Sequence, residues 1–114
     1  MAQNMRARVI EAGYPWRLRL SFTNSMTFEA TATFTMHVRA KVDDSTPIVE
    51  LTTANGGVTR VSATELDIKI PATDASIWPA GKTVVMDLVR TDTGSPEHLG
   101  LTLQVPVRKP VTRL

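Results

Sequence analysis

The sequence predicts an all-β fold in which two antiparallel sheets, with seven to nine short strands in total, pack face to face. Two observations lead to this prediction. Apolar residues recur at every second position in several segments of the 114-residue chain, which is the period of a strand with one buried face. Segments rich in Gly, Pro, Asn and Asp separate these strands at the spacing typical of sandwiches and barrels. A small barrel stays open as an alternative, because only topology separates it from a sandwich.

Four predicted strands show the clearest alternation of apolar and polar residues, at 16–22, 34–42, 66–70 and 99–105. In the first of them, the apolar face consists of Trp16, Leu18, Leu20 and Phe22. In residues 34–42, five apolar positions alternate with Thr, His, Arg and Lys. None of these segments has a helical period, so each is predicted to be a strand with one face in the core.

Turn signals define the remaining strands. Residues 43–47 precede a predicted strand at 48–52, and Asn55-Gly56-Gly57 follows it. Because Asn and Gly tolerate the positive φ angles of a primed turn, we expect a hairpin between residues 48–52 and 58–61. Residues 91–96 are expected to join a strand at 83–90 with the last strand in a second hairpin.

One segment departs from the β pattern. Residues 73–78 begin with Thr73, a residue type that caps helices, and stop before Pro79, which predicts a single helical turn. We expect Trp78 to cover one end of the core and Asp74 to cap the turn or complement its dipole. Residues 24–33 fit either a strand or a packed loop. Together these elements predict an immunoglobulin-like antiparallel β-sandwich.

Length and composition indicate one folded domain, residues 1–114, with 42% hydrophobic and 21% charged residues. The chain has no cysteine, which excludes disulfides, thiolate nucleophiles and cysteine metal sites. The first residues run directly into charged positions, so we expect no export by a signal peptide. No apolar stretch approaches the roughly 20 residues of a membrane-spanning helix, so we expect no membrane association.

The net charge of +2 is unevenly distributed along the chain. Residues 1–20 and 101–114 hold seven basic residues and one acid, which gives +6, whereas residues 21–100 hold six basic and ten acidic residues, which gives −4. The two arginines of the first predicted strand would share its outward face, and the C-terminal ones would extend that patch if the last strand lay nearby. The candidate docking residues are Arg17, Arg19, Arg108, Lys109 and Arg113.

No motif for catalysis or metal binding stands out. His37 would lie on the outward side of its strand and His98 beside a turn, so both are interpreted as surface residues. Asp43-Asp44 lacks the spaced oxygen ligands of a calcium loop and is interpreted as a solvated turn. There is no Gly-x-Ser-x-Gly elbow, and the glycine pair at 56–57 lies between strands rather than opening a helix. We therefore expect neither an enzyme nor a cofactor.

A free-standing binding module for carbohydrate or nucleic acid, acting through an exposed sheet face, is the alternative interpretation. The basic ends of the chain would suit nucleic acid, yet most of its aromatic residues fall at inward positions and would not stack on bases, so we do not expect nucleic-acid binding. An exposed Tyr14 or Trp78 beside polar groups would favour carbohydrate.

The order of features resembles the small immunoglobulin-like domain at the N-terminus of phage baseplate upper proteins and in short tail-associated proteins of phages and prophages. The matching stretches span most of the chain: 13–18, 36–39, 66–73, 78–88, 105–107 and 111–113. The family usually has an Asp-Leu-Thr-Gly segment between its second and third strands. Here residues 23–33 replace that segment without a glycine.

The resemblance implies a non-enzymatic virion structural protein that attaches to, or helps to assemble, the baseplate, tail tip or fibre. It supplies no catalytic residue. Its partners would be other phage tail proteins, with self-association into a homo-oligomer as a further expectation. The protein would be made in the cytoplasm of the bacterial host and would reside in the virion tail.

Overall fold

The computed structural model describes residues 3–6, 8–22 and 26–112, and of residues 3–6 it describes the backbone. The described residues form nine strands and one 3₁₀ turn, which confirms the predicted all-β fold. In chain order these elements are β1 (Gln3–Arg6), β2 (Ile10–Glu11), β3 (Trp16–Ser21), β4 (Phe34–Arg39), β5 (Val49–Thr52), β6 (Val58–Ser62), β7 (Glu65–Ile70), η1 (Ala75–Ile77), β8 (Thr83–Arg90) and β9 (Glu97–Arg108).

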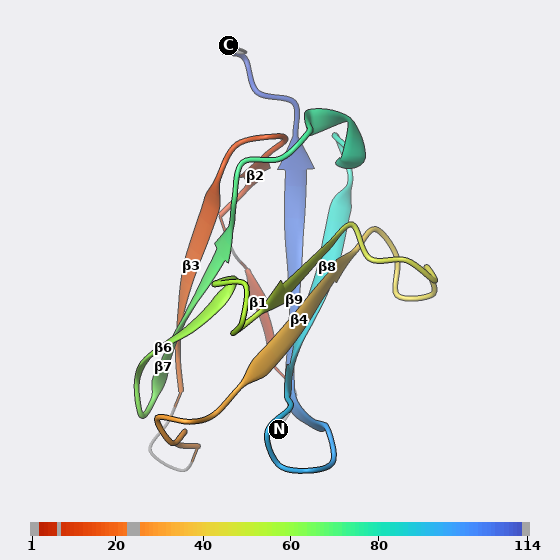
Figure 1. Ribbon diagram of the computed structural model, residues 1–114. Coiled ribbons are helices and arrows are strands. Elements are labelled where there is room, and N and C mark those ends of the chain that lie inside the picture. The colour runs from red at the N-terminus through yellow and green to blue at the C-terminus, as the bar shows by residue number, and fades with distance from the viewer. Residues whose placement is uncertain (1–2, 7, 23–25, 113–114) are drawn as a thin grey trace.

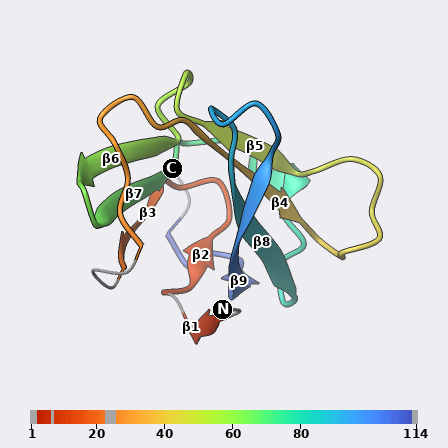
Figure 2. The ribbon, with the colours of Figure 1, turned by 90° about the horizontal axis from the view of Figure 1, so that it is seen from below.

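The strands form two packed layers (Figures 1 and 2). One sheet has the order β1-β9-β8-β4-β5, with β2 also paired to β9, and the other has the order β3-β7-β6. The chain passes from one sheet to the other between β2 and β3, between β3 and β4, between β5 and β6, and between β7 and β8. If β3 is taken as strand B, the layers are B-E-D and C′-C-F-G, which is the arrangement of an immunoglobulin-like sandwich. No strand of the described residues belongs to both sheets, so the sandwich, and not the barrel, is the fold.

The N-terminal strands depart from the predicted antiparallel pairing. Both β1 and β2 pair with β9 in parallel, with Gln3 opposite Leu101 and Ile10 opposite Val107. All other strand pairs are antiparallel. The sequence pattern predicts neither strand, because segments of four and two residues are too short to show an alternation.

One of the two predicted hairpins is confirmed and the other is wrong. β8 and β9 form an antiparallel hairpin, as residues 91–96 predict. The Asn55-Gly56-Gly57 turn instead carries the chain between sheets, since β5 pairs with β4 and β6 pairs with β7. Gly56 does adopt the expected positive φ, +80°. The Asn55 side chain, however, accepts hydrogen bonds from the backbone N–H groups of Thr52 and Gly57, both at 2.9 Å, and so holds a compact corner rather than a two-strand ladder.

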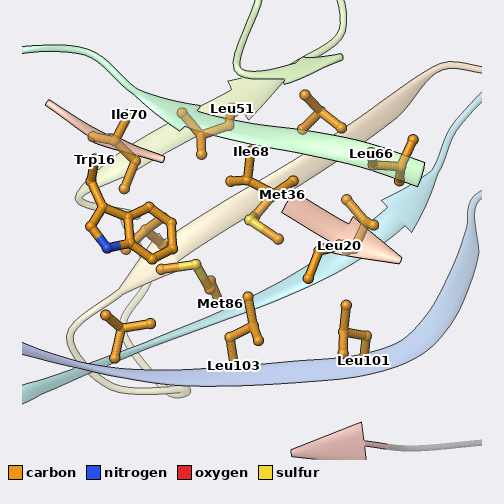
Figure 3. Close-up of a cluster of buried hydrophobic side chains, with 14 of the residues drawn as sticks. Trp16, Leu20, Met36, Leu51, Leu66, Ile68, Ile70, Met86, Leu101 and Leu103 are labelled. Atoms are coloured by element: carbon orange, nitrogen blue, oxygen red, sulfur yellow. The ribbon is translucent and has the colours of Figure 1, made fainter. Parts of the chain in front are cut away.

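The core is a single cluster of buried apolar side chains, and no buried residue of the described chain is polar or charged. It is built from the alternate residues of both sheets, as Figure 3 shows for side chains of β3, β7, β4, β8 and β9. Leu18 and Phe22 of the first predicted strand are partly buried against the cluster, and Trp16 and Leu20 are fully buried. The predicted inward face of residues 16–22 is therefore confirmed.

The connection between β7 and β8 closes one end of this core. Trp78 is 6% exposed, which confirms the prediction that it covers the end. Of the two residues predicted to cap this turn, Asp74 is confirmed and Thr73 is wrong, because the Asp74 carboxylate accepts from the backbone N–H of Ser76 at 2.9 Å. Thr73 has another partner, because its hydroxyl accepts from Trp78 Nε1 at 2.7 Å. This bond holds the indole over the core.

The ambiguous segment 24–33 is a packed loop over residues 26–33, and residues 24 and 25 lie outside the described residues. Phe28 and Ala32 are buried, and the Phe28 N–H donates to the Ala63 carbonyl at 2.7 Å. Phe28 meets Phe22 and Phe34 edge to face, with centroid distances of 5.2 and 5.0 Å. The loop thus closes the opposite end of the core with aromatic rings.

Candidate docking surface

The basic residues that the sequence singles out fall on two different sheets. Arg17 and Arg19 share the exposed outer face of β3, as predicted. Arg108 ends β9 and Lys109 follows it, both exposed, on the other sheet. β9 pairs with β8, β1 and β2 rather than with β3, so strand pairing does not merge the two groups. Arg113 lies outside the described residues.

Two of these arginines form ion pairs within the chain. Arg19 donates to both carboxylate oxygens of Asp67, at 2.7 and 3.1 Å, from the directly opposite position on β7. Arg108 makes a similar bidentate pair with Glu11 of β2, with Nε–Oε distances of 2.8 and 3.0 Å. These hydrogen bonds lower the pKa of both carboxyl groups and raise the pKa of both guanidinium groups. Arg19 and Arg108 therefore already have acidic partners.

The opposite arrangement is found where β3 begins. Arg17 lies directly across from Lys69 of β7, so two exposed positive charges face each other on the sheet surface. Like charges at opposed positions destabilise a sheet. No carboxylate of the described residues lies within 4 Å of either cation. Such a pair is costly in the free protein and favourable beside an acidic partner.

This pair belongs to one end of the sandwich, which we call the basic end (Figure 1, the end at which β9 finishes and η1 lies). Backbone hydrogen bonds hold its segments together, among them Ala12 N to Arg108 O, Thr73 N to Gly13 O and Gly81 N to Val107 O, at 2.8 to 3.1 Å. Its exposed basic residues are Arg8, Arg17, Lys69, Lys82, Arg108 and Lys109, and its acidic residues are Glu11 and Asp74. Among the described residues, six basic and two acidic ones give this end a charge of +4.

The basic end also carries a hollow of about 520 Å³. Its lining residues are mostly small or apolar: Ala12, Gly13, Tyr14, Thr73, Ala75, Ser76, Ala80, Lys109 and Pro110. Two large apolar side chains stand in solvent at this end, Ile77 at 43% and Val111 at 96% exposure. Apolar surface next to charged groups is typical of protein-binding sites.

The other end of the sandwich is acidic, and we call it the acidic end. It consists of the loop 26–33, the β6–β7 hairpin and the β8–β9 hairpin, and its charged residues are Glu29, Arg60, Glu65, Arg90, Asp92 and Glu97. Four acids and two bases give the described part of this end a charge of −2. Arg90 donates to both oxygens of Asp92, at 2.8 and 3.1 Å. Together with a hydrogen bond from the Thr33 N–H, this pair lowers the pKa of Asp92 to about 2.

In both histidines, each of the two ring nitrogens forms a hydrogen bond. Arg39 can only donate, so His37 Nδ1 accepts from it at 2.9 Å, and His37 Nε2 donates to Glu50 at 2.8 Å. In His98, Nδ1 accepts from the Gly100 N–H and Nε2 donates to Asp87, both at 2.9 Å. Neither imidazole keeps a free lone pair for a general base to use. The hydrogen bonding supports a surface role for both residues.

The structure also places the residues that the sequence analysis considered for metal and carbohydrate binding. Asp43-Asp44 lies in the turn between β4 and β5, as predicted. Within the described residues, no three histidine or acidic side chains cluster closely enough to hold a metal ion. No helix there is long and apolar enough to cross a membrane. Trp78 is buried, and Tyr14 is partly buried with its hydroxyl donating to Thr112 O at 2.6 Å, so neither offers the exposed ring that would favour carbohydrate.

Comparison with known proteins gives no relative. No family model matches the chain, and neither the curated proteins nor the solved structures contain a match.

Besides Arg8, sequence reasoning misses two further contributors to the basic end, Lys69 and Lys82. Both lie in the part of the chain with net negative charge, so summing charge along the sequence hides them. Lys69 is recognised only through the β3–β7 register, which sets it opposite Arg17. Register of this kind is not readable from one strand alone.

Proposed function

We propose that the protein is a non-enzymatic structural and assembly component of a phage or prophage tail, in the baseplate, the tail tip or a fibre attachment. It acts by binding other tail proteins through its basic end. The observation that carries the proposal is the combination of a +4 charge, exposed apolar side chains and a hollow on this one end. A surface of this composition suits a protein partner with acidic side chains.

The position of the family-like segments supports the proposal. Of the stretches that resemble small phage tail proteins, residues 13–18, 66–73, 78–88 and 105–107 all begin or end at the basic end. Residues 111 and 112 lie there too. The resemblance therefore includes segments of the surface that is best suited to docking, in addition to strands of the core.

The test is to locate the protein in particles. Virions are purified from the phage or induced prophage that encodes the chain, and the protein is sought by mass spectrometry and by immunogold electron microscopy. The proposal expects the label at the tail. Purified virions that lack the protein would contradict it.

Measuring the binding of tail proteins at increasing salt concentration tests docking through the basic end. The immobilised protein should retain tail proteins, identified by mass spectrometry, at about 0.01 M salt and release them near 1 M, because exposed charges are screened. The variant Lys82→Gln/Lys109→Gln should bind less, whereas Lys41→Gln in the β4–β5 turn serves as a control for charge change outside the basic end. Equal retention by all three proteins would argue against docking through the basic end.

A further inference from the structure

The two ends of the sandwich complement each other in charge. One end carries +4 and the other −2, and the molecule is 40 Å long. At physiological salt, electrostatic interactions decay over about 8 Å, so the two ends act as independent sites. Opposite charge on two separate surfaces favours contact between the basic end of one molecule and the acidic end of another.

The ends also complement each other in shape. The β8–β9 hairpin projects from the acidic end (Figure 1), and all of its turn residues, 91–96, are exposed. Gly94 has a φ of +82°, which lets the chain reverse within this short turn. The basic end offers the hollow of about 520 Å³, with Lys109 in its lining and Lys82 two residues after Ala80 of the lining, its backbone N–H donating to Pro79 O. A projecting turn on one copy thus has a receiving hollow on the next.

Acidic side chains flank the projecting β8–β9 turn, as contact with a basic surface requires. Glu97 follows the turn, and Glu29 lies close enough to influence Arg90 electrostatically, as Glu97 does. Arg90 is already paired with Asp92, and both glutamates are exposed. With the turn in the hollow, Glu29 and Glu97 would approach the lysines of the neighbouring copy.

We propose that copies of this chain associate head to tail, with the β8–β9 turn of each copy seated in the basic-end hollow of the next. The inference rests on the proposed assembly function and names a partner, a second copy. Because the two contacting surfaces differ, the interface is heterologous, and each copy uses both ends. Repeated contacts of this kind close into a ring or continue as a filament.

Engineered cysteines test the contact directly, since the chain has no cysteine of its own. Ser95→Cys labels the turn and Ser76→Cys labels the hollow, and both serines are exposed. An equimolar mixture of the two variants is oxidised at about 0.01 M salt, and disulfide-linked species are separated by non-reducing electrophoresis. Ser45→Cys, in the exposed turn between β4 and β5, replaces Ser95→Cys in the matched control.

The proposal expects about fivefold more mixed dimer from Ser95→Cys with Ser76→Cys than from Ser45→Cys with Ser76→Cys, because docking raises the local thiol concentration. A chain with both Ser76→Cys and Ser95→Cys should form a ladder of linked multimers or a closed ring. Adding Glu29→Gln/Glu97→Gln to that chain should reduce the linked species severalfold. A mixed yield equal to the control would overturn the inference.

The experiment separates the inference from the function on which it rests. A chain found in virion tails whose copies do not cross-link overturns head-to-tail association alone. A chain that cross-links as expected but is missing from purified virions overturns the tail assignment alone.

Discussion

The two ends of the sandwich are closed by different side chains. At the basic end, the indoles of Trp16 and Trp78 are buried, and each donates its Nε1–H, to Arg8 O at 2.8 Å and to Thr73 Oγ1 at 2.7 Å. At the acidic end, three phenylalanines stack edge to face without a polar partner. The buried rings of the basic end are therefore oriented by side-chain hydrogen bonds as well as by packing, whereas those of the acidic end are held by apolar contact.

This difference fits the contacts proposed for each end. A hollow keeps its shape only if its lining is fixed, and the Trp78–Thr73 bond fixes the segment that contributes Thr73, Ala75, Ser76 and Ala80 to the lining. A projecting hairpin has no cavity to maintain, and packing beneath it is sufficient. Substitutions at the two ends should accordingly change the free energy of unfolding by different amounts and for different physical reasons.

The largest effect is expected at the acidic end from Phe28→Ala. Phe28 is 3% exposed and contacts two rings, so its truncation leaves a cavity and should lower the free energy of unfolding by about 3 to 5 kcal/mol. Urea denaturation measures the change. Phe28→Leu, which keeps most of the apolar volume, is the control and should lose clearly less. A loss below about 1 kcal/mol for the alanine variant would show that the ring stack does not close this end.

A smaller effect with a different origin is expected at the basic end from Trp78→Phe. The phenyl ring still covers the core but cannot donate to Thr73, so the free energy of unfolding should fall by about 1 to 2 kcal/mol. Thr73→Val removes the other partner, and the double variant completes a thermodynamic cycle. Strictly additive losses would contradict the role given to this hydrogen bond.

The smallest effect concerns acid sensitivity. The ordinary pKa of an aspartate is about 4, and that of Asp92 is held at about 2 by Arg90 and the Thr33 N–H. Because the folded state has the lower pKa, the stabilisation is complete above pH 4 and is lost as the pH falls towards 2. Asp92→Asn should flatten the stability profile in this range.

A matched comparison for the pH dependence of stability is provided by Glu11 at the basic end. Glu11 has a pKa lowered by Arg108, and Glu11→Gln should also flatten the acid limb of the curve. Melting temperatures of the wild type and both variants between about pH 2 and pH 6 give the measurement. An unchanged profile in Asp92→Asn would show that this carboxyl group does not titrate as its contacts require.

The sequence predicts the strands well because a half-buried strand must alternate, and residues 34–39 show this alternation directly in their burial. Prediction from the sequence fails where the role of a residue depends on contact with a residue far away in the sequence. Gly57 illustrates this failure: a Cβ there would lie 2.6 Å from Leu51 Cβ, so the glycine serves close packing at a crossing between sheets and not a hairpin. Parallel pairing of β1 and β2 likewise depends on β9, about 100 residues away.

The docking surface is predictable only in part for the same reason. Arg17 and Lys109 are visible as basic residues near the chain ends, and both contribute to the basic end. The sequence does not show that Arg19 and Arg108 are paired with Asp67 and Glu11, because those partners lie on neighbouring strands 48 and 97 positions away. Only the fold separates the paired cations from those that remain for a partner.

The most direct test of end-to-end docking is a dilution series of two-dimensional ¹H–¹⁵N NMR spectra at low salt. With rising concentration, the amide signals of residues 92–95 and 97 at the acidic end and of residues 73–76 and 109 at the basic end should shift together. The signals of the outer face of β4 and β5 should stay in place. Shifts confined to one sheet face, or to only one of the two ends, would contradict the head-to-tail contact.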